Sequence, residues 1–253
     1  MFLSLSRRVP SSPLIAGLAL LAALLDLAGC QAARMEVPPE VRAQAAEMPV
    51  RGRQVLGLDS DITFGPYAAR GIQRGWTETT TRGAWWGNLD YSQVSASQRY
   101  EFSMLAPGTP PLRCRCASGV DQQMLDVYLG RGGELSIQMA GRDNLVCAAE
   151  EGPGQPVWRL ALGRGASQAV YHGTVTGGGG IHQVRGSQRL AGTPMPLTEA
   201  SGYEFLAMGR PVGAVEVLNE GAVWLPGGLS PAARRDLAAA AAALLLHQQI
   251  GRR

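Results

Sequence analysis

The sequence predicts a mainly β domain, an antiparallel barrel or sandwich, that ends in one apolar helix. Three observations support this prediction. The 253-residue chain contains 33 glycines and 16 prolines, which divide it into short segments as turns do between strands. From residue 55 onward, apolar or alternating runs follow one another without a helical pattern between them. The one long helical pattern without a breaker lies at residues 231–249.

Composition describes a globular chain and narrows the choice of partners. The basic residues are all arginine, and 23 of them face 20 acidic residues, for a formal charge of +3. This charge is too small, and too evenly spread, to indicate nucleic-acid binding. We therefore expect no nucleic-acid partner.

The first thirty residues read as an export signal. Arg7 and Arg8 precede an apolar run from Leu14 to Leu25, which is shorter than a membrane-spanning helix. The run ends in Leu27, Ala28, Gly29 and Cys30, which resembles the lipobox of bacterial lipoproteins. The resemblance implies cleavage before Cys30, so that residues 1–29 are removed and the Cys30 sulfur carries a diacylglyceryl group. An ordinary secretory signal is the alternative.

Gln31 follows the lipidated position. By resemblance to enterobacterial lipoproteins, the absence of aspartate there implies an outer-membrane protein that faces the periplasm. Residues 30–54 are rich in Ala, Pro, Glu and Arg, and we expect a flexible tether, with a short helix at 41–48. The folded domain is then predicted to span residues 55–253.

Ten strands are predicted in this domain, and no helix lies between them, as in a sandwich or barrel. Their ranges are 77–86, 98–105, 124–129, 134–139, 157–162, 169–176, 181–185, 203–208, 213–218 and 222–225.

The terminal helix has a clear beginning and an unusual composition. Ser230 is a good N-cap and Pro231 suits the first helical position. Residues 237–246 are all Ala or Leu, and they span about 15 Å, half of a bilayer core. We therefore expect the helix to be buried by the strands, with Leu237 and the leucines at 244–246 shielded from water.

The last fifty residues resemble the tubby-like and LURP-one fold. The resembling segments are residues 203–206, the turn at 209–211, the strand at 215–218, Val223 with Trp224, and the helix to Leu246. The resemblance implies a closed barrel threaded by its C-terminal helix. Some members of that family bind phosphoinositides or associate with membranes, but none of their binding residues can be matched here.

Three cysteines remain after Cys30, in a compartment where disulfides persist. Cys114 and Cys116 share one face of a strand, too far apart to bridge each other. Either can reach Cys147, and we favour Cys116 because Gly119 and the following turn would send the chain back. Structural zinc is the alternative, but a fourth ligand is missing. We expect neither a metal nor another cofactor.

No catalytic constellation emerges. His172 and His182 flank four glycines, and a hairpin that pairs Thr176 with Ile181 would place the two imidazoles on opposite faces. His247 follows the apolar helix and reads as a polar helix-end residue. We therefore assign no catalytic residue.

Trp85 and Trp86 are the candidate ligand-binding residues. Adjacent residues in a strand face opposite sides, so that one of the two is exposed or interfacial. The alternative is a tryptophan that covers a second sheet layer.

Together these features predict a lipid-anchored cell-envelope protein, a non-catalytic module that binds or assembles with an envelope protein or lipid. One alternative is a carrier that holds a lipid or another apolar ligand inside its barrel. The other is an envelope hydrolase with a site not yet identified. A filled barrel would argue against the carrier.

Overall fold

The computed structural model describes residues 32–53, 61–75, 78–86, 89–129, 133–150, 157–165, 168 and 170–247. For residues 81, 83–86, 89–94, 121–129 and 133–142, the description is of the backbone alone. The chain divides into two compact units, residues 1–32 and residues 33–253, and the second unit is the one described below.

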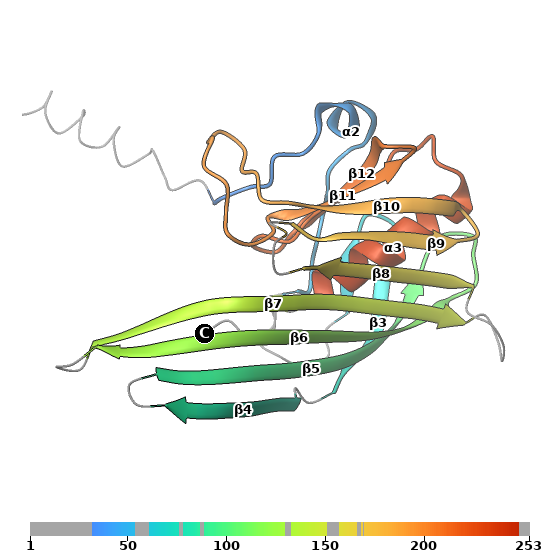
Figure 1. Ribbon diagram of the computed structural model, residues 1–253. Coiled ribbons are helices and arrows are strands. Elements are labelled where there is room, and N and C mark those ends of the chain that lie inside the picture. Colours follow the sequence, from blue (N-terminus) through green and yellow to red (C-terminus); the bar gives the residue numbers. More distant parts are fainter. Residues whose placement is uncertain are drawn as a thin grey trace, which may run out of the picture. The chain divides into compact units, whose positions relative to one another are not determined.

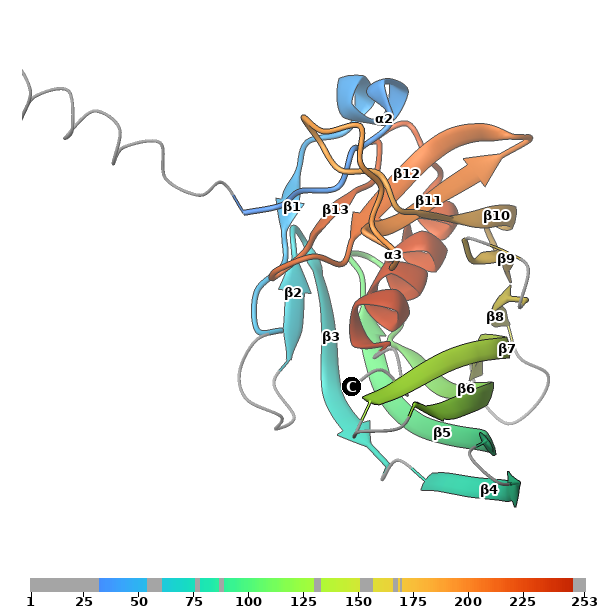
Figure 2. The same ribbon diagram turned by 60° about the vertical axis from the view of Figure 1, so that its left-hand side comes forward.

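Twelve antiparallel strands form a nearly closed barrel (Figures 1 and 2). Their order around the barrel is β1-β13-β12-β11-β10-β9-β8-β7-β6-β5-β3-β2, and β4 pairs with β5 outside this path. The path closes where Arg51, just after β1, exchanges two backbone hydrogen bonds with Thr63 of β2, at 2.9 and 3.0 Å. Of the two predicted architectures, the barrel is the one that forms.

The strands are β1 (Met48–Pro49), β2 (Ile62–Phe64), β3 (Tyr67–Arg74), β4 (Glu78–Trp86), β5 (Leu89–Leu105), β6 (Leu112–Leu129), β7 (Gly133–Glu150), β8 (Trp158–Arg164), β9 (His172–Gly177), β10 (Gly180–Ser187), β11 (Gly202–Ala207), β12 (Arg210–Glu216) and β13 (Ala222–Trp224). The predicted strands all fall within or overlap these. The prediction missed β1, β2, β3, the first halves of β5 and β6, and the second half of β7.

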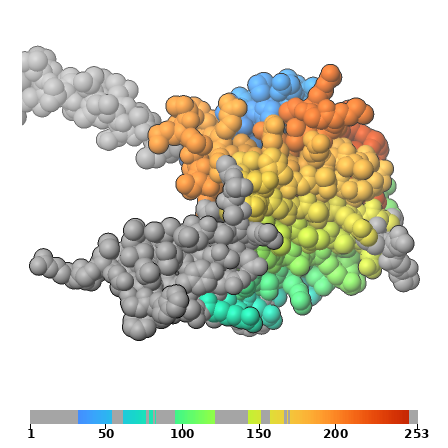
Figure 3. Space-filling view, in the orientation of Figure 1, coloured from blue at the N-terminus to red at the C-terminus, as the bar shows by residue number. Residues whose placement is uncertain are grey.

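Helix α3 (Pro231–Leu246) runs through the barrel, as Figure 2 shows. Ser230 is its N-cap, as predicted, and the Ser230 hydroxyl oxygen accepts a hydrogen bond from the Ala233 backbone N–H at 3.1 Å. Every residue from Leu237 to Leu246 is at most 2% exposed, which confirms the predicted burial. In Figure 3 the wall of strands covers the helix, and red surface is visible only at the right-hand edge.

Small helix residues and large strand residues complement each other in the core. The six alanines at 238–243 have no exposed surface, and they allow strands to approach the helix closely. The strands, together with Tyr171 just before β9, supply large buried side chains, namely Tyr100, Phe102, Trp158, Tyr171, Tyr203 and Phe205.

Polar side chains from the barrel satisfy backbone groups of the buried helix. The Trp158 indole donates to the Asp236 carbonyl at 3.0 Å, and the Tyr100 hydroxyl donates to the Ala243 carbonyl at 2.8 Å. Near the C-terminal end, Arg53 donates to the Leu245 carbonyl and Arg74 to the Leu246 carbonyl, each at 3.0 Å. The two arginine bonds remove the cost of burying carbonyls that the last helical turn leaves free.

The four glycines at 177–180 form the turn between β9 and β10, and two of them touch the helix. A Cβ atom at Gly177 would overlap the Asp236 carboxylate, and one at Gly179 would overlap the backbone of Ala233. The Gly179 N–H also donates to Asp236 Oδ2 at 2.7 Å. The glycines are therefore explained by the close approach of this turn to α3.

The N-terminal segment is not the flexible tether that was predicted. Residues 33–53 belong to the domain, which begins well before residue 55. Three apolar side chains of this segment are buried against β12 and β13, and a short helix, α2 (Pro39–Gln44), lies beside them. These side chains are Met35, Val37 and Val41, each at most 4% exposed.

A buried carboxylate holds the start of this segment. Glu216 accepts a hydrogen bond from Arg34 Nε and another from the Met35 backbone N–H, each at 2.8 Å. The Asn219 side chain donates to the Ala33 carbonyl at 2.8 Å. Scattered apolar residues in a polar sequence suggested a tether, whereas their spacing fits a docked extended segment followed by one helical turn.

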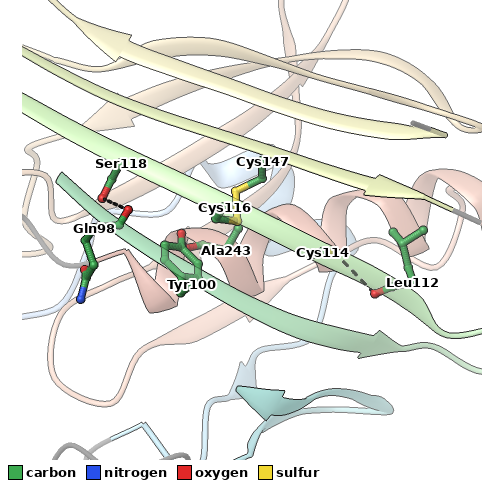
Figure 4. Close-up of a disulfide and its surroundings, with 8 residues drawn as sticks. All are labelled: Gln98, Tyr100, Leu112, Cys114, Cys116, Ser118, Cys147 and Ala243. Carbon is green, nitrogen blue, oxygen red and sulfur yellow. Dashed lines mark hydrogen bonds between the residues drawn. A yellow bond between two sulfur atoms is a disulfide. The ribbon is translucent and has the colours of Figure 1, made fainter. Parts of the chain in front are cut away.

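The predicted disulfide joins Cys116 and Cys147, directly opposite each other on β6 and β7 (Figure 4). Their Cα atoms lie 4.1 Å apart. The reason given for choosing Cys116 was wrong, because β6 continues through Gly119 and the chain returns only after Leu129. Cys114 is buried as a free thiol opposite Ala149, and burial raises its pKa. In the chain-entropy account, closing this loop contributes about 3 to 4 kcal/mol.

Candidate functional site

The long strands β5, β6 and β7 extend beyond the barrel on one side (Figure 1). Strand β3 pairs with β5 only from residue 100 to 105, apart from Gly75 N–H donating to the Arg99 carbonyl, and β8 pairs with β7 only from 143 to 149. Beyond these limits the extensions pair with one another and with β4. We call β4 and residues 89–97, 119–129 and 133–144 of β5, β6 and β7 the projecting sheet.

The register arranges this sheet in rows that cross all four strands. Successive residues of a strand lie on opposite faces, so that alternate rows belong to one face. We call the outer face the one that bears Ser97 and Asn144, which are exposed, opposite the face of buried Ala96 and Leu145. From the barrel outward, its rows are Glu78, Ser97, Gly119 and Asn144; Thr80, Ser95, Asp121 and Arg142; Arg82, Gln93, Gln123 and Ala140; Ala84, Tyr91, Leu125 and Ile137; and Trp86, Leu89, Val127 and Leu135.

The two candidate tryptophans occupy neighbouring rows. Trp86 pairs with Leu89 in the outermost row of the outer face, and Trp85 pairs with Asp90 in the adjacent row of the other face. The prediction that they belong to opposite faces therefore agrees with the register. The structure describes only the backbone of these two tryptophans.

A surface depression of about 370 Å³ lies where the projecting sheet leaves the barrel. Its lining is mostly polar, with Glu78, Thr80, Ser95, Ser97, Gly119 and Asn144 among its residues. Gly119 has no side chain to fill the depression. A Cβ atom at this position would lie only 3.0 Å from the Asn144 side-chain oxygen. Hydroxyl, amide and carboxylate groups on one shallow surface suit a polar contact.

The three histidines lie in separate places. The hairpin has the predicted register, with Ile181 opposite Thr176, His182 opposite Val175 and His172 opposite Arg185. His172 is exposed, whereas His182 is buried on the other face, where desolvation lowers its pKa against the opposing effect of the Asp236 carboxylate. The two rings therefore do not converge on a common ligand.

His247 is buried at the end of α3, although it was read as an ordinary polar helix-end residue. Its ring packs edge-on against Tyr171, with centroids 6.5 Å apart, and desolvation lowers its pKa to about 4. Beside it, Asp143 of β7 accepts hydrogen bonds from the Tyr171 hydroxyl, at 2.9 Å, and from Arg164. The Arg164 and Asp143 charges compensate each other, as in a structural ion pair.

Among the described residues, no group of three or more His, Cys, Asp and Glu side chains is placed to hold a metal ion. Cys30, the predicted lipidation site, lies outside the described residues. No helix in the described part of the chain is long and apolar enough to cross a membrane. No family model, curated protein or solved structure matches this chain.

The apolar rows of the projecting sheet were missed at the sequence level, although the sequence carries a signal for them. In the first half of β6 the buried residues have even numbers, from Leu112 to Val120. In the second half most apolar residues have odd numbers, at Leu125, Val127 and Leu129, and Met124 is the exception. This change of phase within one strand marks the place where the apolar face switches sides.

Proposed function

We propose that this chain is a lipid-anchored cell-envelope protein that acts as a non-catalytic binding or assembly module. Its anchor is Cys30, and its place is the periplasmic face of the outer membrane. The filled barrel carries this proposal, because α3 and the aromatic residues around it occupy the interior in which a carrier would hold its ligand. Binding is therefore assigned to the outside of the molecule, on the projecting sheet.

The tubby-like resemblance belongs to the same proposal. The resemblance implies a closed barrel threaded by its C-terminal helix, and the nearly closed barrel around α3 supports the proposal. Function does not follow from this architecture alone, because one fold hosts many functions. The phosphoinositide site of that family is accordingly not transferred to this chain.

Site-specific photocrosslinking in the native envelope tests the binding role. Amine-directed reagents are unsuitable because the sequence has no lysine. A photoreactive phenylalanine derivative in place of Tyr91 should form adducts with an envelope component, either a protein or a lipid. The matched control is the same derivative at Ile181, which is 70% exposed on the barrel wall.

Adducts at position 91 that are absent at position 181 are the expected result. Equal adducts at both positions, or none at either, would contradict the assignment of binding to the projecting sheet.

A further inference from the structure

We propose that an internal water molecule is bound at the end of the barrel where α3 begins, between Arg235 and Asp236 of α3 and His182 of β10. This inference is independent of the proposed anchor and of the projecting sheet. It concerns His182 and the four-glycine turn, two sequence features that the proposed function leaves aside.

Arg235 and Asp236 form a buried ion pair with a gap too long for a hydrogen bond. Arg235 Nε lies 3.6 Å from Asp236 Oδ1, and the two side chains are 12% and 1% exposed. Asp236 Oδ2 accepts the Gly179 N–H, whereas neither Oδ1 nor Arg235 Nε has a hydrogen-bond partner in the described part of the chain. Two buried atoms of complementary polarity at this distance can be bridged by one water molecule.

His182 supplies a third unpartnered atom in the same place. Its side chain belongs to the inner face of β10, in the row next to that of Gly180 and Gly177. A Cβ atom at Gly177 would overlap the Asp236 carboxylate, so that this carboxylate lies over the row next to His182, about 7 Å along the strand. His182 is 5% exposed, and its Nδ1 has no hydrogen-bond partner among the described residues.

The protonation states decide what each of the three atoms can do. Desolvation lowers the pKa of His182, with the Asp236 carboxylate partly opposing it, so that the neutral imidazole has one N–H and one lone pair. Burial raises the pKa of the Asp236 carboxyl group, while the Gly179 N–H and the Arg235 guanidinium favour the carboxylate. A carboxylate oxygen can only accept a hydrogen bond, and Arg235 Nε can only donate one.

This set of atoms selects a neutral molecule that both donates and accepts hydrogen bonds. The Arg235 guanidinium would repel a cation, and the Asp236 carboxylate would repel an anion. Water satisfies all three atoms at once, because it can accept from Arg235 Nε–H and donate to Asp236 Oδ1 and His182 Nδ1. Internal waters make about three hydrogen bonds to buried groups that lack other partners.

The surrounding backbone encloses the site. The turn at 177–180 has no side chains, and it approaches α3 so closely that a Cβ atom at Gly179 would overlap the backbone of Ala233. Arg234 Nε is also unpartnered, but consecutive helix residues point about 100° apart. The Arg234 charge opposes the effect of burial on the pKa of Tyr67 in β3, so that it faces that strand and lies outside the site.

A high-resolution crystal structure and water-to-protein NOE spectra of the same protein test this site. The crystal structure should show one ordered oxygen within hydrogen-bond distance of Arg235 Nε, Asp236 Oδ1 and His182 Nδ1. In solution, the Gly179 amide proton, which points at the Asp236 carboxylate, should show an NOE from a long-lived water molecule.

His182→Phe removes one of the three partners and should abolish this NOE. The matched control is His172→Phe, at an exposed position on the other face of the same hairpin, and it should keep the NOE. Direct hydrogen bonds among Arg235, Asp236 and His182, with no oxygen between them, would overturn the inference. A His182→Phe protein that retains the NOE would overturn it as well, and the wild-type measurements decide if this variant does not fold.

Discussion

Buried acidic residues hold the apolar helix and the N-terminal segment in place, and their partners come from distant parts of the chain. Asp236 binds the glycine turn, and Glu216 binds Arg34 and Met35. Sequence patterns predicted the histidine faces, because a strand alternates with period two and a hairpin fixes its own register. The Cys116–Cys147 pair was also predicted, but from a turn after Gly119 that does not form. These patterns did not reveal Glu216 or Asp236, since nothing in the local sequence distinguishes a buried acid from an exposed one.

His247 makes the stability of the domain depend on pH. Its pKa is about 4 in the folded chain, against 6.5 for an exposed histidine. Below pH 6.5 the unfolded chain binds a proton that the folded chain does not, so that the free energy of unfolding falls as the pH falls toward 4. The full effect of this shift is about 3 kcal/mol.

Replacing His247 with Phe should remove this part of the acid sensitivity while leaving the contribution of His182. Urea unfolding of the variant and the wild-type protein at pH 7 and pH 4.5 measures the difference. His172→Gln, at an exposed position, is the control and should retain the wild-type pH dependence. An unchanged pH dependence in His247→Phe would contradict the buried, neutral imidazole.

At the scale of elements, the C-terminal helix and the later strands could be predicted, and the N-terminal elements could not. The helix has a cap, a proline and no breaker. In contrast, β1 and β2 have two and three residues, too few to show a period. The segment at 33–53 has a polar composition, and only its contacts with β12 and β13 reveal that it is docked. Barrel closure depends on the same segment, through Arg51, which is why barrel and sandwich could not be separated from the sequence.

The alanines of α3 provide a test of how tightly this element is packed. Ala240 has no exposed surface, so that Ala240→Leu adds three carbon atoms to a filled interior and should lower the free energy of unfolding by about 1 to 3 kcal/mol. Ala232→Leu, at a half-buried position in the first turn of the same helix, should change it far less. Thermal and urea unfolding measure both variants. A more stable Ala240→Leu protein would reveal a cavity beside the helix.

At the scale of the whole molecule, the proposed function assigns the barrel and the projecting sheet different roles. The barrel is a packed scaffold, closed by the N-terminal segment and filled by α3. In the proposed function the sheet is the binding surface. Only part of this surface was expected, from Trp85 and Trp86, because its remaining apolar residues become neighbours through the pairing of β5, β6 and β7.

The central claim is that a filled barrel is anchored directly at Cys30. Native mass spectrometry of the protein purified from its own envelope tests it most directly, with Cys30→Ser as the control. The account predicts a chain that begins at Cys30 and carries acyl groups, with no further ligand, whereas Cys30→Ser lacks these groups. An unmodified N-terminus at another residue would contradict the anchor, and an apolar ligand bound in one-to-one ratio would contradict the filled barrel.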